Sequence, residues 1–77
     1  MITKEEAAYV LHYYDPRKGW QGGSFATALI HAFTKADAEN TMRLAMGFPG
    51  YYEAMRLARY ERYGLDTLES IFNQGEV

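Results

Sequence analysis

The chain has 77 residues, a formal net charge of −2 and 48% hydrophobic residues, and it contains no cysteine. This composition excludes disulfides and thiolate metal sites, and no segment has the pattern of a signal peptide or a membrane span. We therefore expect one soluble, cytoplasmic domain over residues 1–77, whose small core would benefit from a partner protein or a second copy.

The first helix is expected to begin at Thr3, because Glu6 lies three residues later and completes a capping-box pattern. Apolar residues follow at helical spacing until Asp15-Pro16, where the proline disfavours a helical conformation of the residue before it. Residues 15–23 then form a loop that contains three glycines and Trp20.

A second helix is predicted from Ser24, which is a suitable N-cap residue after two glycines. Asp37 with Asn40 can cap a third helix, although nothing in residues 35–36 forbids one continuous, bent helix. Phe25, Leu29 and Phe33 share one stripe of the second helix, which is apolar over much of its circumference, so we expect this helix to lie centrally and to bury the stripe. The third should turn inward Ala38, Met42, Ala45 and Met46.

A fourth helix is predicted over residues 49–63, with Pro49 in its first turn and Gly64 just past its end. Gly47 fits the same terminal position after the third helix. A last short helix should be capped by an acidic box, Asp66 with Glu69. The sequence thus predicts an all-α protein, a compact bundle of four to five short helices.

The glycine loop offers a weak anion-binding pattern. Gly22, Gly23 and Ser24 precede a helix, whose free N–H groups and dipole favour a phosphate. The lysine and the spacing of a P-loop are missing, however. The favoured interpretation is a turn that lets Trp20 fold back onto the core.

No catalytic or metal-binding constellation is visible in the sequence. His12 and His31 do not have metal-ligand spacing, and His31 on an apolar helix is expected to be packed or partly exposed. A charge pair between His12 and Asp15 is a further expectation. The carboxylates are scattered over helix starts and outer faces, so we predict neither an enzyme nor a cofactor.

The fourth helix carries the candidate partner-binding face. Tyr52, Arg56, Arg59 and Tyr63 are spaced four, three and four residues apart, which places them on one side of a helix. Arg43 and Arg62 would extend this face. Tyrosine and arginine are the residue types that binding hot spots favour. The core stripe would lie opposite, at Ala54, Leu57, Ala58 and Leu65. In the alternative interpretation the face is solvated, the arginines pair with Glu53 and Glu61, and the tyrosines lie on neighbouring helices.

The middle of the chain resembles a family of small helical open reading frames from bacteriophages and mobile elements of Gram-positive bacteria. The resemblance is carried by Trp20 to Phe25, Leu29-Ile30, Asp37 to Asn40 and Leu44 to Pro49. It implies no activity, cofactor or catalytic residue. It implies a setting in which small accessory proteins bind host machinery, and some block defence systems such as CRISPR effectors.

These observations favour a protein-binding module that acts on a host protein or complex, with an anti-defence inhibitor as one specific version. A helix-turn-helix-like nucleic-acid-binding protein is one alternative, although the negative net charge counts against it. A homo-oligomeric structural or assembly protein is the other, because a chain this short has a limited core.

Overall fold

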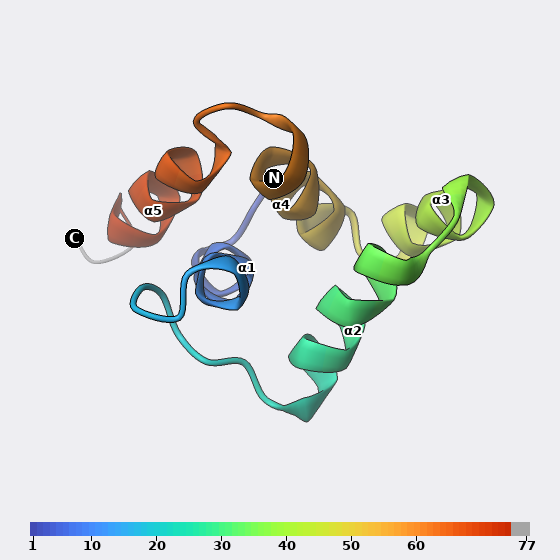
Figure 1. Ribbon diagram of the computed structural model, residues 1–77, viewed down its shortest axis with the longest axis horizontal. Coiled ribbons are helices and arrows are strands. Elements are labelled where there is room, and N and C mark those ends of the chain that lie inside the picture. Colours follow the sequence, from blue (N-terminus) through green and yellow to red (C-terminus); the bar gives the residue numbers. More distant parts are fainter. Residues whose placement is uncertain (75–77) are drawn as a thin grey trace.

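The computed structural model describes residues 1–74, and this range forms five helices joined by short connections (Figure 1). They are α1 (Lys4–Tyr14), α2 (Ser24–Lys35), α3 (Ala38–Gly47), α4 (Pro49–Tyr60) and α5 (Gly64–Gln74). The predicted all-α bundle of short helices is therefore confirmed. No helix in the described range is long and apolar enough to cross a bilayer.

Helix α1 lies at the centre of the bundle and packs against α2, α4 and α5, which surround it in Figure 1. Its buried side is formed by Ala7, Ala8, Val10 and Leu11. The other helices add further buried core residues, which are Leu29, Ile30, Phe33, Ala54, Met55 and Leu68. The buried side of α1 thus forms the middle of the core, and each outer helix packs against only part of it.

The central position predicted for the second helix is therefore wrong. Of the stripe predicted for α2, Leu29 and Phe33 are buried, but the prediction is wrong for Phe25, which is 66% exposed.

The start of α1 has the predicted capping box. The Glu6 backbone N–H donates to the Thr3 hydroxyl at 3.1 Å, and the Thr3 N–H donates to the Glu6 carboxylate at 2.8 Å. Gly50, in the first turn of α4, lies directly against this carboxylate, and a Cβ there would collide with it. The missing side chain therefore lets α4 approach the first turn of α1. The negative charge of the Glu6 carboxylate then lies close to the positive, N-terminal end of the α4 dipole, which is a favourable interaction.

Helices α2 and α3 are two separate helices. Ala36 has an extended backbone with ψ of 139°, and the Asn40 N–H donates to the Asp37 side chain at 2.9 Å. The aspartate cap predicted from the sequence is confirmed, and it satisfies an N–H that would otherwise begin the helix without a partner. The single bent helix that the sequence also allowed is excluded.

Two predicted helix ends are wrong. Ser24 is the first helical residue of α2, and the N-cap position is taken by Gly23, which makes no side-chain bond. Gly47 is the last helical residue of α3, and Phe48 caps both α3 and α4. Pro49 does lie in the first turn of α4, as expected, and needs no hydrogen-bond partner there.

The predicted inward stripe of α3 is also wrong. Met42 and Met46 are 59% and 83% exposed, and α3 has no fully buried residue. Leu44 and Phe48 are half-buried instead, and they pack against the core. In Figure 1 α3 lies at the periphery of the bundle, so only one side of it meets other helices.

The connection between α4 and α5 differs from the prediction as well. Helix α4 ends at Tyr60, and Gly64 is the buried first residue of α5. A Cβ on Gly64 would collide with the Leu57 carbonyl, so the glycine is needed for close packing of the two helices. The predicted start of the last helix at Asp66 is wrong, because α5 begins at Gly64. Asp66 lies within the first turn of α5, where its negative charge interacts favourably with the positive end of the helix dipole.

Candidate partner-binding site

A pocket of about 200 Å³ lies between α2, α3 and α4. Three residues of the predicted face, Tyr52, Arg56 and Arg59, are in its wall. The remaining wall residues are Phe33 and Ala36 at the end of α2 and its joint, Thr41 of α3, and Met55 and Tyr60 of α4. The tertiary structure therefore places the tyrosine–arginine side of α4 beside a concave surface.

Tyr60 belongs to this site, although it was not among the predicted residues. It lies four residues after Arg56 and eight after Tyr52, so helical spacing places all three on one side of α4. The residue is 73% exposed. The spacing is compatible with Tyr60 as well as Tyr63, and α4 ends at Tyr60, so Tyr63 lies beyond the helix and Tyr60 takes its place beside the pocket.

Arg56 is held by two carboxylates. Its guanidinium donates to Glu53 at 3.1 and 3.4 Å and to Glu61 at 3.2 Å. The hydrogen bond and the charge of Glu53, followed by those of Glu61, raise the pKa of Arg56. The pairing that the sequence analysis gave as the alternative for this face is therefore confirmed for Arg56, whose charge is largely balanced within the chain.

Arg59 has a different environment. Its guanidinium donates to the Phe33 carbonyl at 3.1 Å, which is one of the last carbonyls of α2, and lies over the Tyr60 ring at 5.5 Å. Among residues 1–74 it forms no ion pair with a carboxylate. A neutral acceptor thus fixes the orientation of this cation, while other N–H groups of the guanidinium stay available for an anionic group.

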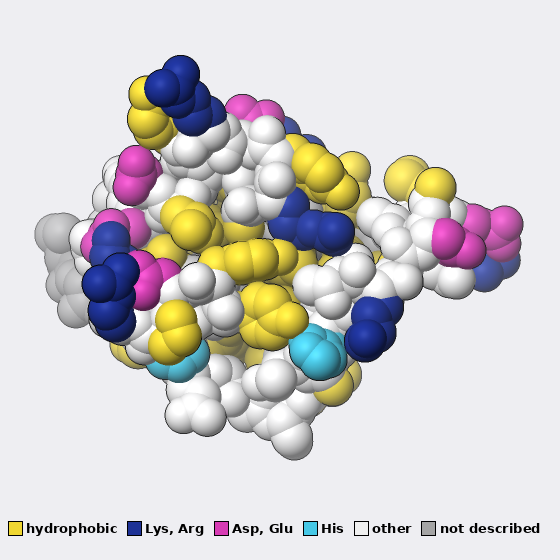
Figure 2. Space-filling view, viewed as in Figure 1, with side chains coloured by type: hydrophobic (Ala, Val, Ile, Leu, Met, Phe, Trp, Pro, Cys, Tyr) yellow, Lys and Arg dark blue, Asp and Glu magenta, His cyan; other side chains and the backbone are white. Residues whose placement is uncertain are grey.

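Aromatic side chains continue from this arginine across the end of α1. Burial raises the pKa of Tyr14, and the positive charge of Arg59 acts in the opposite direction. Tyr14 meets Tyr13 edge to face at 5.1 Å, and Tyr13 meets His31 of α2 at 5.8 Å. The face drawn in Figure 2 has a central band of hydrophobic side chains, with basic and histidine side chains beside it and acidic ones mostly toward the edges.

Three predicted residues lie elsewhere. Arg62 and Tyr63 are in the turn after α4, with the guanidinium 5.4 Å from the centre of the tyrosine ring, and neither lines the pocket. Arg43 lines a neighbouring pocket between α2 and α3 and is paired with Glu39, one turn earlier on the same helix. The structure thus divides the predicted face into a central group and two peripheral ones.

The glycine loop is used for close packing. Gly22 lies against Tyr9 and Ala26, where a Cβ would be 3.0 Å from the Ala26 Cβ, while Gly23 is open to its surroundings. Trp20 folds back as expected, and its ring meets Phe72 edge to face at 5.2 Å. Because Ser24 makes no cap, its hydroxyl is exposed at the start of α2; the anion-binding role of Gly22, Gly23 and Ser24 stays a prediction.

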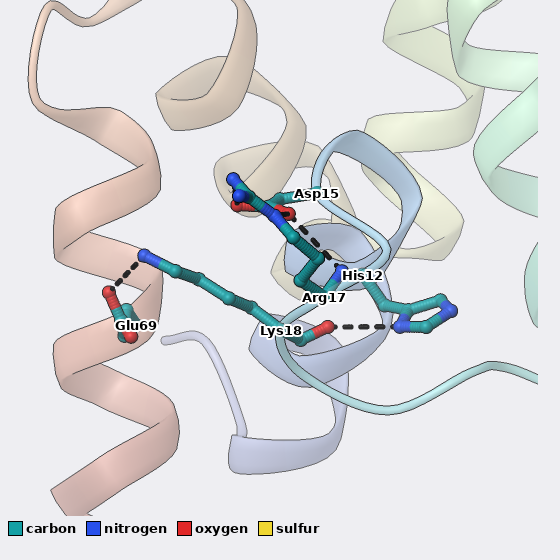
Figure 3. Close-up of polar contacts among 5 residues, drawn as sticks. All are labelled: His12, Asp15, Arg17, Lys18 and Glu69. Atoms are coloured by element: carbon teal, nitrogen blue, oxygen red, sulfur yellow. Dashed lines mark hydrogen bonds and ion pairs between the residues drawn. The ribbon is translucent and has the colours of Figure 1, made fainter.

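The polar contacts of the loop between α1 and α2 are shown in Figure 3. His12 donates from Nδ1 to the Lys18 carbonyl at 2.9 Å, and Asp15 pairs with Arg17 at 3.1 Å. The expected charge pair between His12 and Asp15 is therefore wrong. Lys18 also pairs with Glu69 at 3.0 Å, which fastens the loop to α5. These contacts give His12 a structural role.

The described range, residues 1–74, contains no cluster of three or more histidine or carboxylate side chains that could hold a metal ion. No protein-family model, curated protein or solved structure matches the chain. The functional assignment therefore rests on the chemistry of the pocket beside α4, where an oriented arginine lies next to exposed aromatic surface.

Proposed function

We propose that the protein is a binding module that acts by occupying the surface of a partner protein, and that the pocket beside α4 is its centre of contact. The observation that carries this proposal is the state of Arg59. Its guanidinium is oriented by the Phe33 carbonyl, has no carboxylate partner in the described range, and lies over the exposed ring of Tyr60. Arginine and tyrosine at a pocket are the residue types that carry most binding energy in protein interfaces.

The partner chemistry that fits is an acidic side chain next to an apolar or aromatic group. A carboxylate can accept charge-assisted hydrogen bonds from Arg59, and the rings of Tyr52 and Tyr60 offer contact area with few freely rotating bonds. Arg56 contributes less, because a new carboxylate would compete with Glu53 and Glu61.

The resemblance to phage and mobile-element reading frames supports a more specific version of the proposal. In this version the partner is a host protein or complex in the cytoplasm, and the module inhibits it by covering a working surface, as an anti-defence protein would. The absence of cysteine is compatible with a reducing compartment.

Self-assembly is the second candidate function, and the apolar side of α3 favours it. Met42 and Met46 are both exposed, and methionine adapts readily to a partner surface. Light scattering over a range of concentrations tests this candidate, because a Met42→Ser/Met46→Ser variant should then dissociate. Nucleic-acid binding has less support, because the chain has a formal net charge of −2 and Arg56 is already paired with Glu53 and Glu61.

The chain contains a matched control for the binding proposal. Arg59-Tyr60 and Arg62-Tyr63 are both arginine–tyrosine pairs with the cation over the ring, but only the first lines the pocket. The tagged protein would be used to capture its partner from a lysate of Gram-positive cells. The Kd would then be measured for Arg59→Ala/Tyr60→Ala and for Arg62→Ala/Tyr63→Ala.

We expect the first double variant to weaken binding by about 100-fold or more, since hot-spot truncations cost about 2 kcal/mol or more each. The second should bind like the unchanged protein. An equal loss of affinity in both double variants, or no loss of affinity in either, would contradict the proposed site.

A further inference from the structure

The second pocket, of about 390 Å³, lies in the angle between α2 and α3. Its apolar lining is half-buried and consists of Ala32 and Ala36 on the α2 side and Leu44 and Phe48 on the α3 side. Its polar lining is exposed and consists of Lys35, Asn40 and Arg43. Helix α3 packs on α4 rather than along α2, and this arrangement leaves the angle between α2 and α3 open to a helix of another molecule. Ala36 also lines the pocket that contains Arg59.

The apolar surface continues along α2 beyond this pocket. Phe25 is 66% exposed, and its ring lies 5.9 Å from that of Phe48. Phe25 and Ala32 are seven residues apart, so they lie on one side of α2 about 10 Å apart at 1.5 Å per residue, and Ala36 follows directly after the last residue of the helix. The alanines leave room for a backbone to approach closely, and this length and shape suit a helix of a few turns.

The two charged side chains that line this groove, Lys35 and Arg43, are both basic. No acidic side chain lines it, and Lys35 forms no ion pair within the described part of the chain. Arg43 pairs with Glu39, but both side chains are largely exposed, and such a pair contributes little, so a partner carboxylate can replace Glu39. The groove is therefore complementary to an apolar segment that carries carboxylates along its edge.

We propose that the groove between α2 and α3 binds an amphipathic helix of the partner protein, with the apolar stripe of that helix on Ala32, Leu44 and Phe48 and its carboxylates facing Lys35 and Arg43. This inference rests on the proposed function, because the groove shares Ala36 with the Arg59 pocket and one partner would cover both. The binding mode is that of a helix in a groove, with anchors three and four residues apart.

The test uses a designed helical peptide with a leucine stripe flanked by glutamates, and a matched peptide with lysines in place of the glutamates. Binding is followed by amide chemical shifts of the full chain. The glutamate peptide should shift the amides of residues lining the groove, and the lysine peptide should bind at least about tenfold more weakly, because like charges would then face Lys35 and Arg43. Equal affinities, or shifts confined to other surfaces, would overturn the inference.

Two variants and a control locate the binding. Lys35→Glu reverses an exposed charge, and Ala32→Glu places a carboxylate in the groove without touching the Arg59 pocket. Both should abolish preference for the glutamate peptide, while Arg17→Glu, on the distant α1–α2 loop, should leave it unchanged. Circular dichroism of Lys35→Glu, whose side chain is exposed, shows whether the fold is kept.

The two proposals can fail separately. If both groove variants keep full peptide affinity while Arg59→Ala/Tyr60→Ala still loses the captured partner, the helix-binding groove is wrong and the binding module stands. If the groove variants lose the peptide while the captured partner is indifferent to Arg59 and Tyr60, the proposed site at Arg59 is wrong, and the single partner covering both pockets is withdrawn.

Discussion

Arg59 links three helices through one side chain. It projects from α4, donates to the Phe33 carbonyl of α2 and acts electrostatically on Tyr14 of α1. An arginine held in this way loses little rotational freedom on binding, because its rotamer is already fixed. Arg59 and Arg62 are both exposed and both lie over a tyrosine ring, so the hydrogen bond to the Phe33 carbonyl is the main difference between them.

The position of Arg59 predicts a change in the titration of Tyr14. Burial raises the pKa of Tyr14 by disfavouring the phenolate, and the cation of Arg59 partly offsets this effect. Arg59→Ala should therefore raise the pKa of Tyr14 further, whereas Arg62→Ala should not. The tyrosine ring carbons can be followed by NMR through alkaline pH; an unchanged Tyr14 titration in Arg59→Ala would contradict the contact.

The raised pKa of Tyr14 makes the stability of the folded protein depend on pH in the alkaline range. The folded protein keeps the Tyr14 proton at pH values where the unfolded chain has lost it, so this contribution is full below the ordinary tyrosine pKa of about 10 and is lost as the pH rises above it. Tyr14→Phe should make the alkaline decline in stability less steep.

Helix ends and connections decide how the five elements are arranged. The Asp37 cap begins α3 after a two-residue joint, and the capping box of Thr3 and Glu6 begins α1. These signals depend on residues three positions apart, so the sequence analysis identified them correctly. The α4–α5 corner depends instead on a close approach between Gly64 and Leu57, which no local pattern reveals.

The two helix starts at Ser24 and Asp37 should respond differently to alanine. Asp37→Ala removes a cap bond to the Asn40 N–H and should cost about 1 kcal/mol. Ser24→Ala removes no cap, because Gly23 holds that position, and should change stability by less than about 0.5 kcal/mol. Urea unfolding of both variants checks this, and an equal loss would mean that Ser24 does cap α2.

Two glycines at helix ends offer a similar comparison. Gly64→Ala would drive a Cβ into the Leu57 carbonyl and should cost about 1–3 kcal/mol, as overpacking typically does. Gly47→Ala meets no atom within 4 Å at the last residue of α3, and it should stabilise by up to about 1 kcal/mol. Thermal unfolding of the two variants tests this comparison. If Gly64→Ala is as stable as the unchanged protein, α4 and α5 can move apart at their connection without loss of stability.

The whole molecule depends on one core that is centred on α1. Val10 and Leu11 are fully buried and lie in one cluster with residues of α2, α4 and α5, while α3 contributes no buried residue. The outer helices are consequently unequal: α2, α4 and α5 each contribute buried residues to the core, whereas α3 lies outside it and, with α2 and α4, forms the walls of the two candidate binding pockets.

Leu11→Ala should cost about 2–5 kcal/mol, because it leaves a cavity at the point where several helices meet. In a chain of 77 residues such a loss is a large part of the total stability, so all helices should unfold together. Met46→Ala is the matched control, and its exposed side chain predicts a change within about 0.5 kcal/mol. The reverse order of the two losses, measured by denaturant unfolding, would contradict the placement of α3.

Local sequence patterns were sufficient to predict the all-α class, the caps at Thr3 and Asp37, and the spacing that places Tyr52, Arg56 and Arg59 on one side of α4. Each of these depends on contacts within one or two helical turns, which the order of residues sets directly. The exposure of Met42 and Met46 and the place of Tyr60, rather than Tyr63, beside the pocket do not follow from such local patterns. The pairing of Arg56 with Glu53, three residues earlier on the same helix, was an alternative that the spacing allowed, but the bond from Arg59 to the Phe33 carbonyl joins α4 to α2. These non-local outcomes depend on the direction the chain takes after Ala36 and after Tyr60, because that direction determines how helices distant in the sequence pack.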